Sequence, residues 1–323
     1  MSRSIRRPDT SRTDSNSDTA SARWVLGMGA ILAFALLCAS AGQVHADEPA
    51  DKAAAALRAS YVSLQPKLKQ NQFDRPLALQ SSEGVGKVSG YIHAVINAPF
   101  DAASAALASP EDWCGILNLL ISTKDCKTSR DGQARALNIW VGTSPKQALE
   151  NASRLTLAFN VHAKSANYLR MGLNSIDGPM GTRDILFKLE AIPLDGERTF
   201  VHFSYAYGFG SVGRLAILAY LATFGRDKVG FTLMEARTGE TGSAPQYIAG
   251  QRGIVERNTM RYYLAVEAYL GAMSLPPQVR FEKRIRDWYA GAGRYRRQLY
   301  DMELQEYLDM KRAEYRREAR PPS

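Results

Sequence analysis

The stretch from Ser89 to Cys114, SGYIHAVINAPFDAASAALASPEDWC, contains the change of pattern that decides the fold. Its first part, read together with Lys87 and Val88, places Val88, Ile92 and Ile96 at intervals of four. Alternate side chains of an extended chain share a face, so this spacing predicts a β-strand with one apolar face.

Two short helices are predicted directly after this strand. In DAASAALAS, Asp101 is placed to cap the first helix. In SPEDWCGILNLL, Ser109 is a good N-cap and Pro110 occupies the first helical position, where its missing N–H costs nothing. Acidic Glu111 and Asp112 suit the positive end of that helix dipole.

The segments after residue 130 have the two-residue period of strands. RALNIWVG, SRLTLAFNVHAK and NYLRMGLNS are predicted strands, and TRDILFKLEAIPLDGERTFVHFSYAYGF is a predicted hairpin with Asp195 and Gly196 in its turn. Two of these strands have clear apolar faces. These are formed by Leu155, Leu157, Phe159 and Val161, and by Val201, Phe203, Tyr205 and Tyr207.

The later part of the chain combines an apolar segment with a long amphipathic helix. LAILAYLA, residues 215–222, is apolar nearly all round and fits either a buried helix or a lid that dips into a membrane over a pocket mouth. DKVGFTLMEA and APQYIAG are predicted strands. QRGIVERNTMRYYLAVEAYLGAM is a predicted helix ended by Pro276 and Pro277. Its apolar stripe holds Val255, Tyr262, Val266, Tyr269 and Met273.

The two ends of the folded chain are predicted to be helical. DKAAAALRASYVSLQPKLKQ favours a helix that ends near Pro66, followed by a loop or extended segment, NQFDRPLALQSSEGVGK. The tail, residues 280–320, is highly charged and predicted to be helical, with a break at residues 290–293, AGAG.

The order of these elements predicts an α+β fold. A curved antiparallel sheet would grip the long C-terminal amphipathic helix, which covers its concave face. Four parts are expected along the chain. They are a cleaved signal peptide at 1–46, a helix and linker at 47–84, the helix-grip domain at 85–275, and a charged helical tail at 276–323.

This order of elements resembles that of the START-like, or helix-grip, superfamily, the group of polyketide cyclases and Bet v 1-like proteins. The resemblance covers about residues 85–273. It rests on the stretch from Ser89 to Cys114, with its strand, Pro-Phe break and two short helices, and on the late position of the amphipathic helix. It implies a cavity between sheet and helix for lipids, sterols or other apolar ligands. The apolar segment 215–222 and the tail beyond 276 have no family counterpart.

The residues expected to face this interior come from three strands and the long helix. They are Leu155, Leu157, Phe159, Arg183, Val201, Phe203, Tyr205, Tyr207, Tyr262, Val266 and Tyr269. For each apolar member, a filled core is the simpler interpretation, and the buried phenols favour a cavity because they need polar partners. An inward Arg183 would suit an acidic head group, whereas a solvated pair with Asp184 is the alternative.

The resemblance implies non-catalytic binding or carriage of a hydrophobic small molecule, a lipid above all, without a cofactor. A polyketide cyclase or aromatase-type enzyme is one alternative, and it requires a polar pair inside the cavity. Candidates for that pair are Arg170, Arg183, Glu190 and His202. The other alternative is an envelope protein with a filled core that binds a protein partner through its tail.

The N-terminus is typical of an export signal. Basic residues precede an apolar run from Trp24 to Leu37, and VHA at residues 44–46 predicts cleavage after Ala46. The protein is therefore expected in the periplasm or outside the cell. Cys114 and Cys126 would meet an oxidising compartment there and form a disulfide that joins a helix to the loop after it. Closing a loop of this length stabilises a fold by about 3 kcal/mol.

The charge is strongly basic, with a formal net value of +9. An exported protein seldom meets nucleic acid, so a nucleic-acid partner is not expected. The basic tail is interpreted as a solvated helix face, or else as a peripheral contact with anionic lipid head groups. His93, His162 and His202 have no ligand spacing to one another or to a cysteine, so no metal site is predicted.

Overall fold

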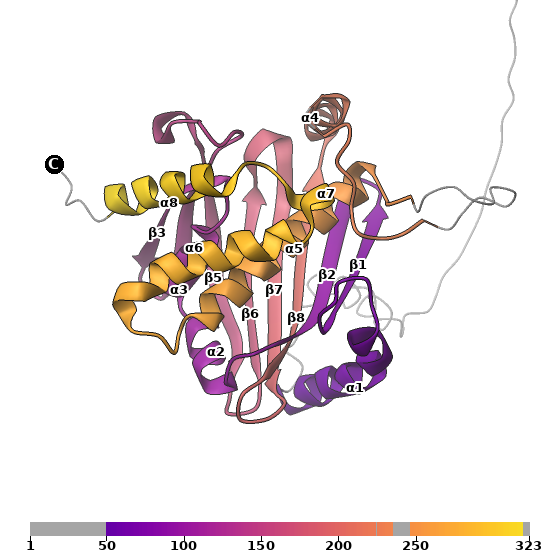
Figure 1. Cartoon of the computed structure of the whole chain (residues 1–323), viewed down its shortest axis with the longest axis vertical. Helices are drawn as coiled ribbons and strands as arrows, with labels where there is room; N and C mark the ends of the chain where they lie inside the picture. The colour runs from indigo at the N-terminus through magenta and orange to yellow at the C-terminus, as the bar shows by residue number, and fades with distance from the viewer. Residues whose placement is uncertain (1–49, 224, 235–245, 319–323) are drawn as a thin grey trace, which may run out of the picture. The chain divides into compact units, whose positions relative to one another are not determined.

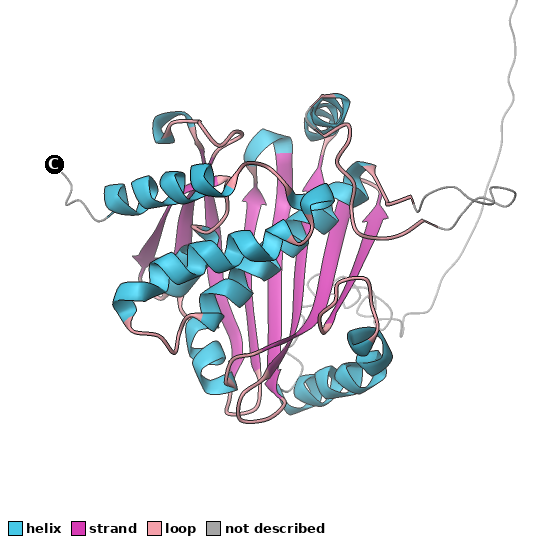
Figure 2. Ribbon diagram, in the orientation of Figure 1, coloured by secondary structure: helices cyan, strands magenta, loops and turns pink. Residues whose placement is uncertain are grey.

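The computed structural model describes residues 50–223, 225–234 and 246–318. The predicted signal peptide, residues 1–46, lies outside the described residues. An eight-stranded antiparallel sheet, with strand order β1-β2-β8-β7-β6-β5-β4-β3, forms the centre of the described chain (Figure 2). Its strands are β1 (Leu77–Gly84), β2 (Lys87–Ile96), β3 (Thr123–Asp131), β4 (Ala134–Val141), β5 (Ser153–Lys164), β6 (Leu169–Asp177), β7 (Thr182–Pro193) and β8 (Thr199–Phe209).

Helices cover the sheet, and α5 crosses one of its faces with α6 and α8 beside it (Figure 1). The α-helices are α1 (Ala50–Lys69), α2 (Phe100–Leu107), α3 (Pro110–Leu117), α4 (Ser211–Ala222), α5 (Gly250–Gly271), α6 (Pro277–Gly293), α7 (Arg296–Leu299) and α8 (Leu304–Glu318). Two 3₁₀ turns, η1 (Leu149–Asn151) and η2 (Pro179–Gly181), flank β5 and β7. This arrangement confirms the predicted α+β helix-grip fold.

Successive side chains along each strand point to opposite faces of the sheet, and each face has its own hydrophobic core. On β8, Val201 and Phe203 belong to the large core beneath α5, whereas Phe200 belongs to a second core with α1. On β2, Ile92 lies in the first core and Val95 in the second. Helix α1 therefore packs on the face opposite α5.

The stretch from Ser89 to Cys114 forms the strand and the two short helices predicted from its sequence. Ser109 caps α3, since its side chain accepts a hydrogen bond from the Asp112 backbone N–H at 3.1 Å. The predicted β7–β8 hairpin is present. Helix α2 differs in detail, because Pro99 is its N-cap and Asp101 lies in the first turn.

Cys114 and Cys126 form the predicted disulfide, with Cα atoms 5.2 Å apart. Cys126 lies on β3 rather than in a loop, so the bond joins helix α3 to the sheet. The polar residues after the helix predicted a turn there, but Thr123–Asp131 form edge strand β3, whose outer half is exposed to solvent. Polar residues are tolerated there because only part of the strand is buried.

The N-terminal region is more regular than predicted. Helix α1 continues through Pro66 to Lys69 instead of ending near Pro66, and the Pro66 carbonyl still accepts a hydrogen bond from Gln70 N–H at 3.0 Å. Residues 77–84, expected as a loop or extended segment, form strand β1. The turn between β1 and β2 contains Gly86, whose φ of +67° suits glycine.

The segments DKVGFTLMEA and APQYIAG do not form two further sheet strands in the described residues. They meet through a single bridge between Leu233 and Tyr247, with hydrogen bonds that join Gly230 and Thr232 to Ile248. The part between them, residues 235–245, lies outside the described residues.

The tail is not the solvated helix expected from its charge. Ile285, Trp288 and Tyr307 are buried in the same core as the sheet, and the rings of Trp288 and Tyr307 stack with centroids 5.0 Å apart. The AGAG sequence is the last turn of α6 rather than a break. The apolar residues of the tail recur every three or four positions and form one stripe along its helices, although most of their neighbours in the sequence are charged.

Candidate functional site

Ten of the eleven residues predicted to face the interior belong to the large core around α5. Leu155, Leu157, Phe159, Val201, Phe203, Tyr205, Tyr207, Val266 and Tyr269 are buried, and Tyr262 is partly buried against them. Arg183 is different: its side chain is 60% exposed and its Nε lies 3.6 Å from Asp184 Oδ2. The start of β7 therefore holds a solvated ion pair.

Aromatic rings occupy the space between the middle of the sheet and α5. Phe187 lies with its ring centroid 4.8 Å from those of Tyr205 and Tyr262, which are 5.0 Å from each other. The phenols of Tyr205 and Tyr262 lie close enough to influence each other's pKa. Burial raises the pKa of Tyr262 to about 12, so both phenols stay neutral at physiological pH. The interior thus has polar atoms as well as apolar rings.

Arg257 on α5 is the functional candidate that sequence reasoning missed. Only 1% of the residue is exposed. Its Nη1 lies 3.4 Å from the Val229 carbonyl and its Nη2 lies 3.4 Å from the Tyr220 hydroxyl. Its Nε has no hydrogen-bond partner in the part of the chain that the structure describes. Its neighbour Tyr207 is one of the predicted interior residues, and burial raises the pKa of that phenol far above its usual value.

No carboxylate of the described residues lies within ion-pair distance of Arg257. The nearby Asp301 carboxylate accepts from Arg261 Nη2 at 2.7 Å and also binds Lys228. Burial lowers the pKa of Arg257, yet an arginine remains charged in proteins. Arg257, Arg261 and Lys228 thus lie near one carboxylate, Asp301, which is ion-paired with the last two.

A signal for Arg257 is present in the sequence. Gly253, Arg257, Met260 and Leu264 share one face of α5 at helical spacing, and all four are buried. A cation that interrupts an otherwise uncharged helix face is costly to bury without a partner, so it marks a candidate site.

Helix α4 lies next to Arg257 and η2 and is visible at one end of the sheet in Figure 1. It contacts Arg257 through the Tyr220 hydroxyl, while Leu215 and Leu218 are 69% and 51% exposed. The interpretation of residues 215–222 as a buried helix is therefore wrong. One side of α4 is apolar and solvent-exposed.

The polar residues considered for catalysis lie elsewhere. His93 and His202 stack at 4.3 Å on the sheet face that bears α1, and His202 Nδ1 lies 3.2 Å from Glu190 Oε2. Tyr168 donates to the other oxygen of Glu190 at 2.5 Å, and Arg170 pairs across the strands with Glu190. These groups form a polar row outside the interior, so they do not provide the expected pair inside it.

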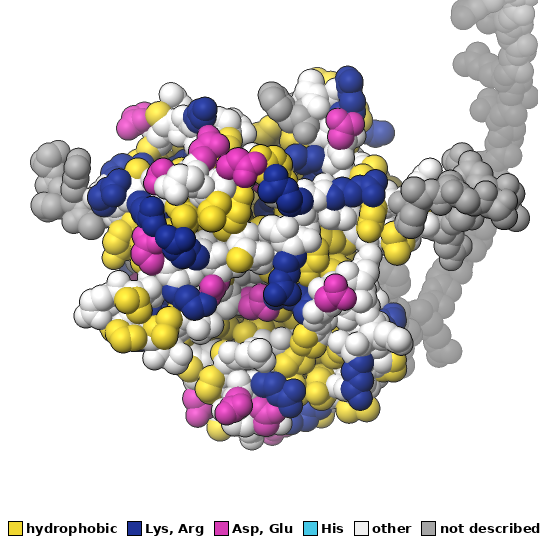
Figure 3. All heavy atoms as spheres, viewed as in Figure 1, with side chains coloured by type: hydrophobic (Ala, Val, Ile, Leu, Met, Phe, Trp, Pro, Cys, Tyr) yellow, Lys and Arg dark blue, Asp and Glu magenta, His cyan; other side chains and the backbone are white. Residues whose placement is uncertain are grey.

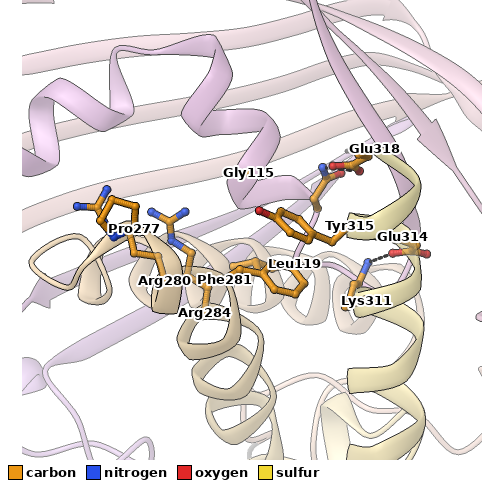
Figure 4. Close-up of a pocket in the computed structure, with 11 residues that line it drawn as sticks. Gly115, Leu119, Pro277, Arg280, Phe281, Arg284, Lys311, Glu314, Tyr315 and Glu318 are labelled. Carbon is orange, nitrogen blue, oxygen red and sulfur yellow. Dashed lines mark hydrogen bonds and ion pairs between the residues drawn. The ribbon is translucent and has the colours of Figure 1, made fainter. Parts of the chain in front are cut away.

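A separate pocket of about 300 Å³ lies among α3, α6 and α8 (Figure 4). A second, of about 480 Å³, lies between the loop after α1 and α7, and Phe73, Phe231 and Tyr295 line it. Neither is lined by any residue of the predicted interior set. Across the described ranges, no three His, Cys, Asp or Glu side chains are grouped to hold a metal, and no helix is long and apolar enough to cross a membrane.

Several solved structures resemble part of this chain at low similarity. An aromatase/cyclase from a Streptomyces species is 13% identical, with 45% of this chain and 85% of that chain covered and a TM-score of 0.31. Norcoclaurine synthase from Thalictrum flavum is 16% identical, with 45% and 85% covered and a TM-score of 0.31.

Human StAR-related lipid transfer protein 5 is 7% identical, with 54% of this chain and 89% of that chain covered and a TM-score of 0.29. No protein-family model matches the sequence, and no curated protein matches it. Likeness at this level supports no conclusion about function, so an argument about function must come from the residues of this chain.

Proposed function

We propose that the protein binds and carries an amphipathic ligand with an acidic head group. The apolar part would lie between the sheet and α5, and the head group would pair with Arg257. One observation carries this proposal: among the described residues, the buried Arg257 guanidinium has no carboxylate at ion-pair distance and its Nε has no hydrogen-bond partner. A buried cation of this kind is costly, and an anionic ligand would remove that cost.

The polar interior supports the same proposal. Phenols such as Tyr207 and Tyr262 can hydrogen-bond to a carboxylate or ester when the rings move apart. Burial of the apolar part would supply most of the binding free energy, at roughly 25 cal/mol per Å² of apolar surface removed from water. The guanidinium would select among ligands of similar apolar area.

Helix α4 is the proposed gate. Its Tyr220 hydroxyl contacts Arg257, and its exposed Leu215 and Leu218 would rest on an anionic membrane while the ligand leaves or enters. The ligand class proposed here is a lipid or fatty acid, and the proposed location is the periplasm or the exterior. A predicted signal peptide and a pair of cysteines joined in a disulfide support export.

Native mass spectrometry of the protein purified from its own envelope without detergent tests carriage directly. We expect a bound mass of lipid size, and lipid extraction of the same sample would give its class. A clean ligand-free mass, with no uptake of a fluorescent fatty acid, would contradict the proposal. The protein would then be interpreted as a filled-core interaction module, as its packed aromatic rings alone would suggest.

The role of Arg257 is tested by comparing a fatty acid with the fatty alcohol of equal chain length. The wild type should bind the acid at least tenfold more tightly, and Arg257→Met should remove the difference. The variant should fold, because replacing a buried unpaired charge by an apolar group is neutral or stabilising. Arg58→Met, on exposed α1 surface, is the matched control and should keep the preference.

A further inference from the structure

The pocket among α3, α6 and α8 has the features of a second binding site, independent of the interior. Its wall includes Gly115 and Asn118 near the end of α3, Phe281 and Arg284 on α6, and Tyr315 on α8. Its volume of about 300 Å³ is that of a small-molecule site. Figure 3 shows Lys and Arg side chains on this part of the helical face, interspersed with Asp, Glu and hydrophobic side chains.

Two guanidinium groups lie on one side of this pocket. Arg284 sits over the Tyr269 ring, 3.4 Å from its centroid, and its Nε lies 3.4 Å from the Tyr269 carbonyl. Arg280 donates through Nε to the Leu275 carbonyl at 2.8 Å. These contacts fix both side chains. Arg284 is also attracted by the Tyr269 phenol and by the Asp112 carboxylate, whose Oδ1 accepts a hydrogen bond from that phenol at 2.5 Å. Within the described ranges, neither guanidinium has a carboxylate at ion-pair distance.

A pair of stacked rings forms the next part of the wall. Phe281 and Tyr315 lie with centroids 4.2 Å apart and an angle of 19° between their planes. Tyr315 is 51% exposed, so one of its faces is open to solvent. In Figure 4 the stacked rings lie between the two arginines and the acidic side chains of α8. A flat apolar group could extend this stack while its charged end faced the guanidiniums.

The two acidic side chains that line the pocket, Glu314 and Glu318, repel a bound anion only weakly. Glu314 Oε2 lies 2.8 Å from the buried Lys311 Nζ, and its other oxygen lies 3.8 Å from Lys124 Nζ. Partial burial and the carboxylate of Asp125 raise the pKa of Glu318 to about 7. Neutralised and half-protonated acids leave the arginine side of the pocket positive.

Asn118 links the wall at the end of α3 to α8, since its Nδ2 donates to Glu318 Oε1 at 3.0 Å. Its Oδ1 is buried from solvent and has no hydrogen-bond partner among the described residues, so it does not face the open pocket and takes no part in the proposed site.

We propose that this pocket binds a small soluble organic anion, with a flat apolar body that carries one carboxylate or phosphate. The anion is held by the terminal amino groups of Arg280 and Arg284, and the body stacks on Tyr315. Arginine forks bind such oxyanions in pairs of parallel hydrogen bonds, which gives the site its selectivity. The disulfide from Cys114 to the sheet fixes α3, which forms the opposite wall.

Isothermal titration of the purified full chain tests this with phenyl phosphate, benzoate and inorganic phosphate. We expect saturable millimolar or tighter binding of the two aromatic anions and weaker binding of inorganic phosphate. Arg284→Gln and Arg280→Gln should each weaken binding at least tenfold. Arg316→Gln, an exposed change of equal charge on α8, should leave the affinity unchanged.

Tyr315→Leu tests stacking separately from charge. It should weaken the binding of phenyl phosphate several-fold and leave the binding of inorganic phosphate unchanged. Circular dichroism melts would establish that each variant is folded. The proposal is overturned by the absence of binding in the folded wild type, or by affinities that Arg280→Gln and Arg284→Gln leave unchanged. It is also overturned if phosphatidylglycerol vesicles bind through these arginines and the soluble anions do not. None of these results depends on ligand carriage in the interior.

Discussion

Gly90 on β2 lies where α5 comes nearest to the sheet. A Cβ at this position would be 2.2 Å from Thr259 Oγ1 and 3.1 Å from its Cβ. Gly90→Ala should therefore lower the free energy of unfolding by about 2 kcal/mol, because the helix must move away from the strand. Urea unfolding measures this change.

Gly84→Ala, with open space around its would-be Cβ, is the matched control and should change stability much less. Adding Thr259→Ala to Gly90→Ala should restore part of the loss. If the two glycine variants lose equal stability, the close approach of α5 is not what requires Gly90.

His93 makes the stability of the fold depend on pH. Burial, together with the adjacent His202, lowers the pKa of His93 to about 4. An unfolded histidine titrates near 6.5, so the unfolded state takes up the proton first as the pH falls. Stability from this group is present above pH 6.5 and is lost progressively down to pH 4, by about 3 kcal/mol.

Unfolding of His93→Gln across this pH range should show a much shallower loss than the wild type. Replacing the exposed His162 by Gln should keep the wild-type slope. Glu190, whose pKa is lowered mainly by hydrogen bonds from His202 and Tyr168 against the effect of burial, loses its contribution only below its ordinary pKa. A slope between pH 6.5 and 4 that His93→Gln leaves intact would contradict the assignment to His93.

At the scale of elements, the disulfide ties helix α3 to edge strand β3. An edge strand has a partner on one side only, so its attachment depends more on other links. Reduction, or the double change of Cys114 and Cys126 to Ala, should lower the free energy of unfolding by about 3 kcal/mol. Urea unfolding with and without reductant measures this. Reductant should have no further effect on the double variant, and a wild type indifferent to reductant would refute the link.

At the scale of the whole molecule, the C-terminal helices are part of the core that the sheet and α5 form. Trp288 is 1% exposed, and its Nε1 donates to the Arg261 carbonyl at 3.3 Å. Trp288→Ala should lower the free energy of unfolding by about 3–5 kcal/mol, which is a large share of the stability of an ordinary domain. Truncation after Leu275 should leave a chain that does not unfold cooperatively.

Thermal and urea unfolding followed by circular dichroism would measure both effects. Val279→Ala on the same helix is the control, because Val279 is 48% exposed and should contribute little. A truncated chain with a sharp transition would show that α6–α8 form a separate appendage.

The sequence by itself determined most of the elements and their order, with edge strand β3 and the segments around 230 and 247 as the exceptions. Local spacing is sufficient for this, since residues such as Val201 and Phe203 on β8 repeat with the period of a strand. Capping chemistry at Ser109 and the turn at Asp195 and Gly196 depend on neighbours in the chain, and both are present as predicted. The pairing of Cys114 with Cys126 was also predicted, from their number and from the sequence pattern of an export signal.

The tertiary structure alone decided which polar residues meet. Arg257 and Tyr220 are 37 positions apart, and Phe281 and Tyr315 are 34 apart, so no local pattern relates them. Strand pairing placed His93 beside His202 and turned Glu190 away from the interior. The burial of the charged tail was decided in the same way. A helix stripe gives the direction of its apolar face, but only packing in three dimensions determines what that face covers.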